Sequence, residues 1–345
     1  MRRRGGFTLI ELLGVMAIIV ILVGISVPAF SGMLRSSRAS LANGTLRSAL
    51  VQARDAALQS VDGGDSAAVF FFDPGGSASI VVCTQAGSIR GVDAGGRPVE
   101  RDVFVADPSF EVQVLPPFWH VNGLARAGTI NGADDMQPGA WYANTRYDGA
   151  SVNWVFPETG FFDPAKPDEG PKRHTFFVRF SAGTGELDIT NDQEALVYVP
   201  SLDLDRSSSP FSMPAFRPDR KSDHRLLIRQ LLSSTQVSPQ DRERLIGDTA
   251  TDSVLMHPVR EIALYDVRDL AKKLRSERVS AFKGIDSQTG SLYRSSGRGE
   301  PTPTIDPELV SEVNRLLPRV AEIFSLDRYT GAARRIPVAQ EEVPS

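Results

Sequence analysis

The longest apolar run of the chain lies at its N-terminus. Residues Leu12 to Phe30 carry no charge, whereas one carboxylate, Glu11, and three arginines at positions 2 to 4 precede them. About 20 apolar residues in a helix, at 1.5 Å per residue, are long enough to cross the hydrocarbon of a bilayer. The pattern therefore predicts a transmembrane helix over residues 7–30.

The helical spacing of apolar residues continues beyond this run, with leucines at positions 34, 41, 46 and 50 and alanines at 53 and 57. We expect one long helix, about residues 7–60, whose soluble half (31–60) packs on a globular domain. Pro28 removes one backbone hydrogen bond and is expected to kink or loosen this helix. Four arginines (Arg35, Arg38, Arg47 and Arg54) lie in the second half, and no acid follows Glu11 until Asp55.

Short apolar and β-branched runs separated by turn-like sequence follow the helix, which is typical of strands. These runs are AAVFFFD, ASIVVCT, RDVFVAD, FEVQVL, SVNWVF, HTFFVRF and GELDI. Pro74-Gly75-Gly76 between the first two indicates a hairpin. The predicted fold class is α+β, with the long helix packed on an antiparallel β-sheet domain over residues 61–200.

The pattern of apolar and polar residues changes at Ser201. Residues 201–223 are polar and proline-rich, as in a linker or long loop. Residues 224–345 predict a mixed α/β extension. It contains helices at 224–232, 238–247, 267–278 and 306–317, a strand at 259–267, a hairpin turning at Thr330-Gly331, and a disordered tail from Ala339.

Composition narrows the function classes. The chain has 345 residues, 41% hydrophobic residues and a net charge of −4, which argues against disorder and against a dedicated nucleic-acid binder. Its single cysteine, Cys83, excludes an intramolecular disulfide.

Glu11 separates three interpretations of the N-terminus. A secretory signal peptide cut near Val27-Pro28-Ala29 would have an unusually long apolar region. A plain membrane anchor places the arginines in the cytoplasm and the bulk outside. It leaves Glu11 unexplained, because a carboxylate in a bilayer costs a few kcal/mol even on lenient scales. The third interpretation rests on a motif.

The stretch GGFTLIEL resembles the processing site of type IV prepilins and pseudopilins. The resemblance implies a six-residue leader (1–6), cleavage by a prepilin peptidase between Gly6 and Phe7, and N-methylation of Phe7. It also implies that Glu11 sets subunit register by pairing with the Phe7 amine during assembly. Pro28, followed by Ala29 and Phe30, matches a proline that is usual in the family.

The resemblance implies partners as well: the peptidase and methylase, other pilin or pseudopilin subunits, the inner membrane and an assembly platform. The chain would be a single-pass inner-membrane protein with a periplasmic bulk, later part of a pilus or pseudopilus. Ala53-Arg54-Asp55-Ala56-Ala57 before the strands is similar to H-type pseudopilins and T-type fimbrial minor pilins. The chain is longer than simple minor pilins.

The sequence offers little catalytic chemistry. The four histidines have no second His or Cys at metal-ligand spacing, and there is no P-loop, Gly-x-Ser-x-Gly or dinucleotide motif. Three acidic stretches (131–137, 163–170 and 201–209) could hold calcium but lack EF-hand spacing. We expect a structural subunit without catalytic residues, metal or cofactor. The alternative is a membrane-tethered periplasmic binding or enzymatic domain that carries a prepilin-like leader.

The acid-free arginine stretch of the long helix also has two interpretations. The first is a solvated helix face near anionic lipid headgroups. The second is contact with DNA, as in uptake pili, which the lack of a basic domain disfavours.

Overall fold

The structure is a computed structural model. It describes residues 9–60, 63–72, 78–92, 98–126, 152–155, 174–188, 194–198, 224–239, 253–280, 282, 284–285 and 307–336. The chain divides into two units, Met1–Gly44 and Thr45–Ser345, which are described one at a time. The expected linker (201–223), the leader (1–6) and the tail (339–345) lie outside the described residues.

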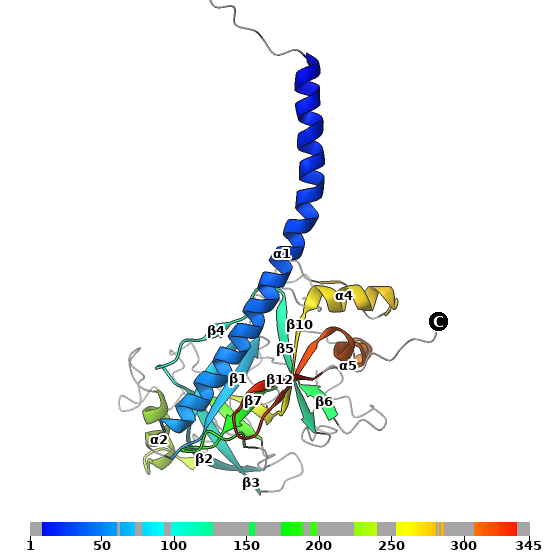
Figure 1. Ribbon diagram of the computed structural model, residues 1–345. Coiled ribbons are helices and arrows are strands. Elements are labelled where there is room, and N and C mark those ends of the chain that lie inside the picture. The colour runs from blue at the N-terminus through cyan, green and yellow to red at the C-terminus, as the bar shows by residue number, and fades with distance from the viewer. Residues whose placement is uncertain are drawn as a thin grey trace, which may run out of the picture. The chain divides into compact units, whose positions relative to one another are not determined.

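Helix α1 (Leu9–Leu58) is the 50-residue helix expected from the apolar spacing. Figure 1 shows it in blue. The helix continues through Pro28 without interruption. In the described part of the chain, no helix meets the length and apolarity needed to cross a membrane. The transmembrane helix over residues 7–30 stays a prediction.

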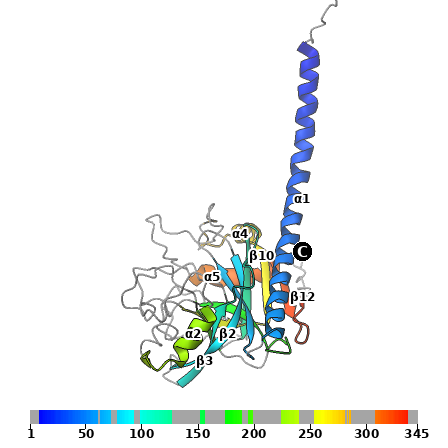
Figure 2. The same ribbon diagram turned by 90° about the vertical axis from the view of Figure 1, so that its left-hand side faces the viewer.

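The larger unit contains a closed ring of strands. β1 (Ser66–Phe72), β7 (His174–Phe180), β9 (Ser253–Pro258), β8 (Ala195–Tyr198), β3 (Pro98–Ala106) and β2 (Ala78–Val92) pair in that order. β2 pairs again with β1 and closes the ring. The short β4 (Gln113–Val114) adds to β2. Figures 1 and 2 show this barrel-like sheet from two sides.

The expected antiparallel sheet is therefore wrong in its topology. The β1–β2 hairpin is antiparallel as predicted, but β3 pairs with β8 in parallel and β7 pairs with β9 in parallel. Parallel pairs need long crossovers between their strands. Residue alternation within one strand does not reveal which distant strand it will join, so the sequence could not predict this closure.

Alternate residues of the ring strands fill its interior. Ala67, Val69, Cys83, Phe104 and Phe177 are all buried there, together with Ala195, Val197, Val254 and Met256. Side chains at every second position of a strand point to the same face, which explains why the paired members within β1, β8 and β9 are each two residues apart. Helix α2 (His224–Ser233) covers the outside of β2 and β3, where Ile228 packs against Val103 and Val105.

A second sheet has the order β12-β11-β10-β5-β6. Its strands are β12 (Ala333–Ile336), β11 (Glu322–Leu326), β10 (Glu261–Asp266), β5 (Trp119–Arg126) and β6 (Val152–Val155), all antiparallel. Helices α4 (Val267–Ser276) and α5 (Pro307–Val320) pack on each other and on β10. Asp266 caps α4 by accepting the Arg268 N–H bond at 2.9 Å.

Most predicted elements are confirmed where the structure describes them, including α2, α4, α5 and the β11–β12 hairpin. Strands β5, β8 and β9 were not predicted. β9 lies in the ring with strands from residues 61–200, and β10 pairs with β5. Strands of the expected C-terminal extension therefore share both sheets with strands of the expected β-rich region. The helix expected at 238–247 lies mostly outside the described residues.

Candidate functional site

Four residues were predicted as the functional site: Gly6, Phe7, Glu11 and Pro28. Gly6 and Phe7 lie outside the described residues. Glu11 and Pro28 both lie on α1, about 25 Å apart along its axis at 1.5 Å per residue. Their side chains are not among those described. The pairing of the Phe7 amine with Glu11 therefore stays a prediction.

The described apolar side chains at the start of α1 are exposed. Large apolar residues between Leu9 and Phe30 range from 48% exposed, at Ile19, to 79%, at Leu9. They include consecutive positions from Ile18 to Val23, so they lie on every face of the helix. Exposed apolar surface of this extent marks an interaction site, because water does not solvate it favourably.

The second half of α1 has the opposite character. Leu46, Ala49, Leu50, Ala53, Ala56 and Ala57 are all buried. Ser66 Oγ, at the start of β1, donates to the Ala53 carbonyl. The loop after β7 also contacts the helix: Gly183 N donates to Ala57 O at 3.0 Å, and Arg54 Nε donates to Gly185 O at 3.2 Å.

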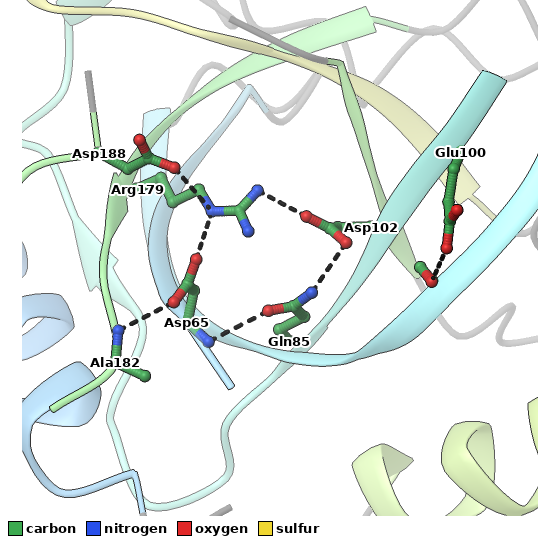
Figure 3. A network of polar contacts seen from close by, with 8 residues as sticks. Asp65, Gln85, Glu100, Asp102, Arg179, Ala182 and Asp188 are labelled. Carbon is green, nitrogen blue, oxygen red and sulfur yellow. Dashed lines mark hydrogen bonds and ion pairs between the residues drawn. The ribbon is translucent and has the colours of Figure 1, made fainter. Parts of the chain in front are cut away.

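An ion-pair network lies beside this contact (Figure 3), and we call it the Arg179 cluster: Arg179, Asp65, Asp102, Asp188 and Gln85. Arg179 Nε lies 2.7 Å from Asp65 Oδ2 and 3.5 Å from Asp188 Oδ2, and its Nη1 lies 2.7 Å from Asp102 Oδ2. Gln85 Nε2 donates to Asp102 at 2.8 Å, and Asp65 N donates to Gln85 Oε1 at 3.2 Å. The Arg179 side chain is only 8% exposed.

The Arg179 cluster joins the ring to the loop that contacts α1. Asp65 Oδ1 also accepts a hydrogen bond from the Ala182 backbone N–H at 2.9 Å, so one carboxylate holds both the guanidinium and the loop after β7. Burial alone would lower the pKa of Arg179, but the charges and hydrogen bonds of Asp65 and Asp102 raise it. The guanidinium therefore stays charged, and its removal would leave three carboxylates without their counter-charge.

Sequence reasoning missed the Arg179 cluster, although a signal was present. Arg179 stands in the apolar strand HTFFVRF, two residues after the interior residue Phe177 and so on the same face of the strand. A charge at an inward position of an apolar strand requires buried partners. Gln85 lies in β2 and Asp102 in β3, Asp65 directly precedes β1, and Asp188 follows β7, so only the closed ring brings these partners together.

The histidines do not gather into one site within the described residues. His120 is half-buried beside Tyr265, with ring centroids 6.0 Å apart, and burial lowers its pKa to about 4 against a raising influence of Asp266. His257 is buried, with Nδ1 3.6 Å from Glu194 Oε1. His174 lies in β7 and His224 begins α2; their side chains are not described.

The described residues contain one buried thiol and no grouped metal ligands. Among the described residues, no three His, Cys, Asp or Glu side chains are grouped so that they could hold a metal ion. The acidic stretches at 131–137, 163–170 and 201–209 lie outside those residues. Cys83 is free and buried in the ring, and burial raises the pKa of its thiol, which makes it unreactive.

The comparisons with known proteins bear on the N-terminus. Residues 1–27 match the family model described as the prokaryotic N-terminal methylation motif. No curated protein and no solved structure matches the chain. The match confirms the resemblance drawn from GGFTLIEL, covers Gly6, Phe7 and Glu11, and ends one residue before Pro28.

Proposed function

On the premise that residues 1–27 form a type IV prepilin-like N-terminus, we propose that this chain is a structural subunit of a type IV pilus or of a type II secretion pseudopilus. A prepilin peptidase cuts the chain between Gly6 and Phe7, and the new Phe7 amine is methylated. The similarity of Ala53-Arg54-Asp55-Ala56-Ala57 to H-type pseudopilins and T-type fimbrial minor pilins favours a minor rather than a major subunit. The match over residues 1–27 is the observation that carries this proposal.

Charge pairing explains the role of Glu11. Cleavage creates a cationic amine at Phe7, and Glu11 follows four residues later, one helical turn away. An isolated amine and an isolated carboxylate are each costly in a medium of low dielectric, whereas a pair neutralises both. The Glu11 carboxylate forms an ion pair with the Phe7 amine of its own chain or of the neighbouring subunit. This pairing sets the register of the subunits during assembly.

The apolar start of α1 serves two environments in turn. Before assembly, the segment with exposed side chains, from Leu9 to Phe30, crosses the inner membrane once. It then joins the apolar bundle of neighbouring N-terminal helices in the filament. The unit Thr45–Ser345 is periplasmic and faces outward, and the role of the chain is structural rather than enzymatic.

Filament fractionation tests the proposal. Filaments sheared from cells that express the full chain should contain it, and cells that lack the peptidase should keep the uncut precursor in the membrane. A membrane-tethered binding or enzymatic domain would stay in the membrane fraction in both strains. That second outcome would overturn the proposal in favour of the tethered-domain alternative.

A further inference from the structure

One face of the larger unit combines exposed apolar residues with arginines. Arg47, Val51, Arg54 and Leu58 follow the spacing i, i+4, i+7 and i+11, so they form a single stripe along α1. The turn of the β11–β12 hairpin lies beside this stripe, because a methyl group added at Gly331 would lie 3.5 Å from Arg54 Cδ. Figure 2 shows the red hairpin next to the lower half of α1.

The hairpin turn adds two exposed side chains to this stripe. Tyr329 is 66% exposed, and the Arg328 guanidinium stacks over its ring at 5.8 Å. We call the six residues Arg47, Val51, Arg54, Leu58, Arg328 and Tyr329 the arginine ridge. Arg47 also stacks over Phe324 of β11 at 5.8 Å, which joins the stripe to the hairpin.

The turn is held rigidly although its tip faces solvent. Asp327 Oδ1 accepts the backbone N–H bonds of Tyr329 and Thr330, at 3.2 and 3.0 Å. The Arg328 carbonyl accepts the Leu187 N–H bond at 2.7 Å. The side chains of Arg328 and Tyr329 are thus presented on a fixed backbone, which lowers the entropy lost on binding a partner.

Apolar exposure is concentrated on this ridge. Among the described residues of Thr45–Ser345, five large apolar or aromatic side chains are exposed, and three of them are Val51, Leu58 and Tyr329. The other two, Val112 and Val114, lie at β4. Tyrosine and arginine are the residues that contribute most to protein interfaces, and no lysine stands on the ridge.

The charges of the ridge lack counter-charges in the described part of the chain. Arg47, Arg54 and Arg328 form no ion pair with a described residue, and Arg54 instead donates to the Gly185 carbonyl. Arginines match carboxylates because the guanidinium donates two parallel hydrogen bonds to one carboxylate. This local excess of positive charge stands in a chain of net charge −4.

We propose that the arginine ridge docks a carboxylate-rich surface of a neighbouring protein subunit. The proposal rests on the proposed function, because a filament supplies that neighbour. Val51 and Leu58 favour a protein over a nucleic acid, since they offer apolar area to bury, and the chain lacks the broad basic face of a nucleic-acid binder. The arginines pair with the partner's carboxylates around this apolar strip.

A photo-cross-linker tests the docking in cells that express the full chain. Benzoylphenylalanine replaces Tyr329, and as a control it replaces Val112, which is 52% exposed at the other apolar site. We expect a protein adduct at 329 that maps to a segment rich in Asp and Glu. No adduct above the level at 112, a nuclease-sensitive adduct, a lipid adduct, or a mapped segment without carboxylates would each overturn the proposal.

Charge reversal at the ridge is the second test of the docking. The pair Arg47→Glu and Arg328→Glu should lower the adduct yield about tenfold or more. The matched pair Arg90→Glu and Lys272→Glu reverses two side chains that are 89% and 71% exposed elsewhere, and should leave the yield within about twofold. Exchanging the mapped carboxylates for arginine should restore the adduct of the ridge variant. An unchanged yield in the ridge variant, or failure of that exchange, would contradict the docking.

The same cells separate the two proposals. The mature N-terminus is read in parallel with the adduct. A methylated Phe7 without the adduct overturns only the docking, whereas the adduct without a methylated Phe7 overturns only the proposed function.

Discussion

The two halves of α1 differ in where their apolar side chains find contacts. Between Leu9 and Phe30 the described apolar side chains are exposed, whereas between Leu46 and Ala57 they are mostly buried within the larger unit. The helical spacing is continuous across both halves. A helix that is apolar on every face needs an environment outside its own chain, and one with a single buried face can be satisfied inside it. Under the proposed function, the first half is the part of the helix that takes part in assembly.

Glu11→Ala should have the largest effect and should act on the first half alone. Without the carboxylate, the Phe7 amine has no partner at the start of the helix, so the amount of chain in sheared filaments should fall about tenfold or more. Membrane insertion should stay intact, because the variant is more apolar.

The control for Glu11 is the stability of the larger unit. Its free energy of unfolding should be unchanged, since Glu11 lies in the other unit. Normal incorporation of Glu11→Ala into filaments would remove the assembly role from this residue.

Arg179→Met tests the second half of the comparison. The change leaves Asp65, Asp102 and Asp188 without their counter-charge and should lower the free energy of unfolding by about 3–5 kcal/mol. Urea unfolding of the full chain in detergent measures it, with the reactivity of Cys83 as a second readout, because this thiol is buried in the ring.

Arg90→Met is the matched control for Arg179. Arg90 is 89% exposed and lies 3.8 Å from Glu100, so its loss should change the stability by less than about 0.5 kcal/mol. Equal effects of the two substitutions would show that the Arg179 cluster does not hold the ring.

His120 gives the larger unit a pH dependence. Burial lowers the pKa of His120 to about 4, below the unfolded value near 6.5, so the unfolded chain takes up a proton first. The contribution of His120 to the free energy of unfolding is fully present above about pH 6.5. It decreases as the pH falls toward 4, by about 3 kcal/mol at most.

The His120→Gln variant isolates that contribution. It removes the titrating ring, so the slope of stability between about pH 6.5 and 4.5 should become flatter than in the parent chain. Chemical unfolding at several pH values measures both slopes. Identical slopes would mean that His120 does not titrate differently in the folded state.

Gly331→Ala should have the smallest effect. Gly331 has a φ of +63°, and an added methyl group would lie 2.6 Å from Phe180 Cε1, so we expect a loss of about 2 kcal/mol in unfolding free energy. Gly183→Ala is the control: its φ of +74° imposes the same backbone strain, but nothing lies within 4 Å of the added methyl. Its loss should be about 1 kcal/mol. Equal losses would exclude crowding at Phe180.

Local patterns in the sequence predict local structure well here. Alternating or β-branched runs predict β1, β2 and β7, and apolar spacing predicts α1, α4 and α5. β8 has only four residues, and β5 contains Asn122 and Gly123, which are unusual in strands. The closure of the ring joins β9 to β7 and β8, from distant parts of the chain, and no local pattern encodes such pairing.

The candidate site is predictable for a different reason. The motif around Gly6, Phe7 and Glu11 is short and contiguous, so it needs no tertiary structure to be recognised. The Arg179 cluster and the arginine ridge join residues far apart in sequence, and only the folded unit brings them together.

The intact mass and N-terminal peptide of the mature chain test the central claim most directly. The account predicts a chain that begins at Phe7 and carries one added methyl group on its amine. A chain that begins at Phe30, as after signal-peptide cleavage, or that keeps Met1 in cells with an active peptidase, would contradict it.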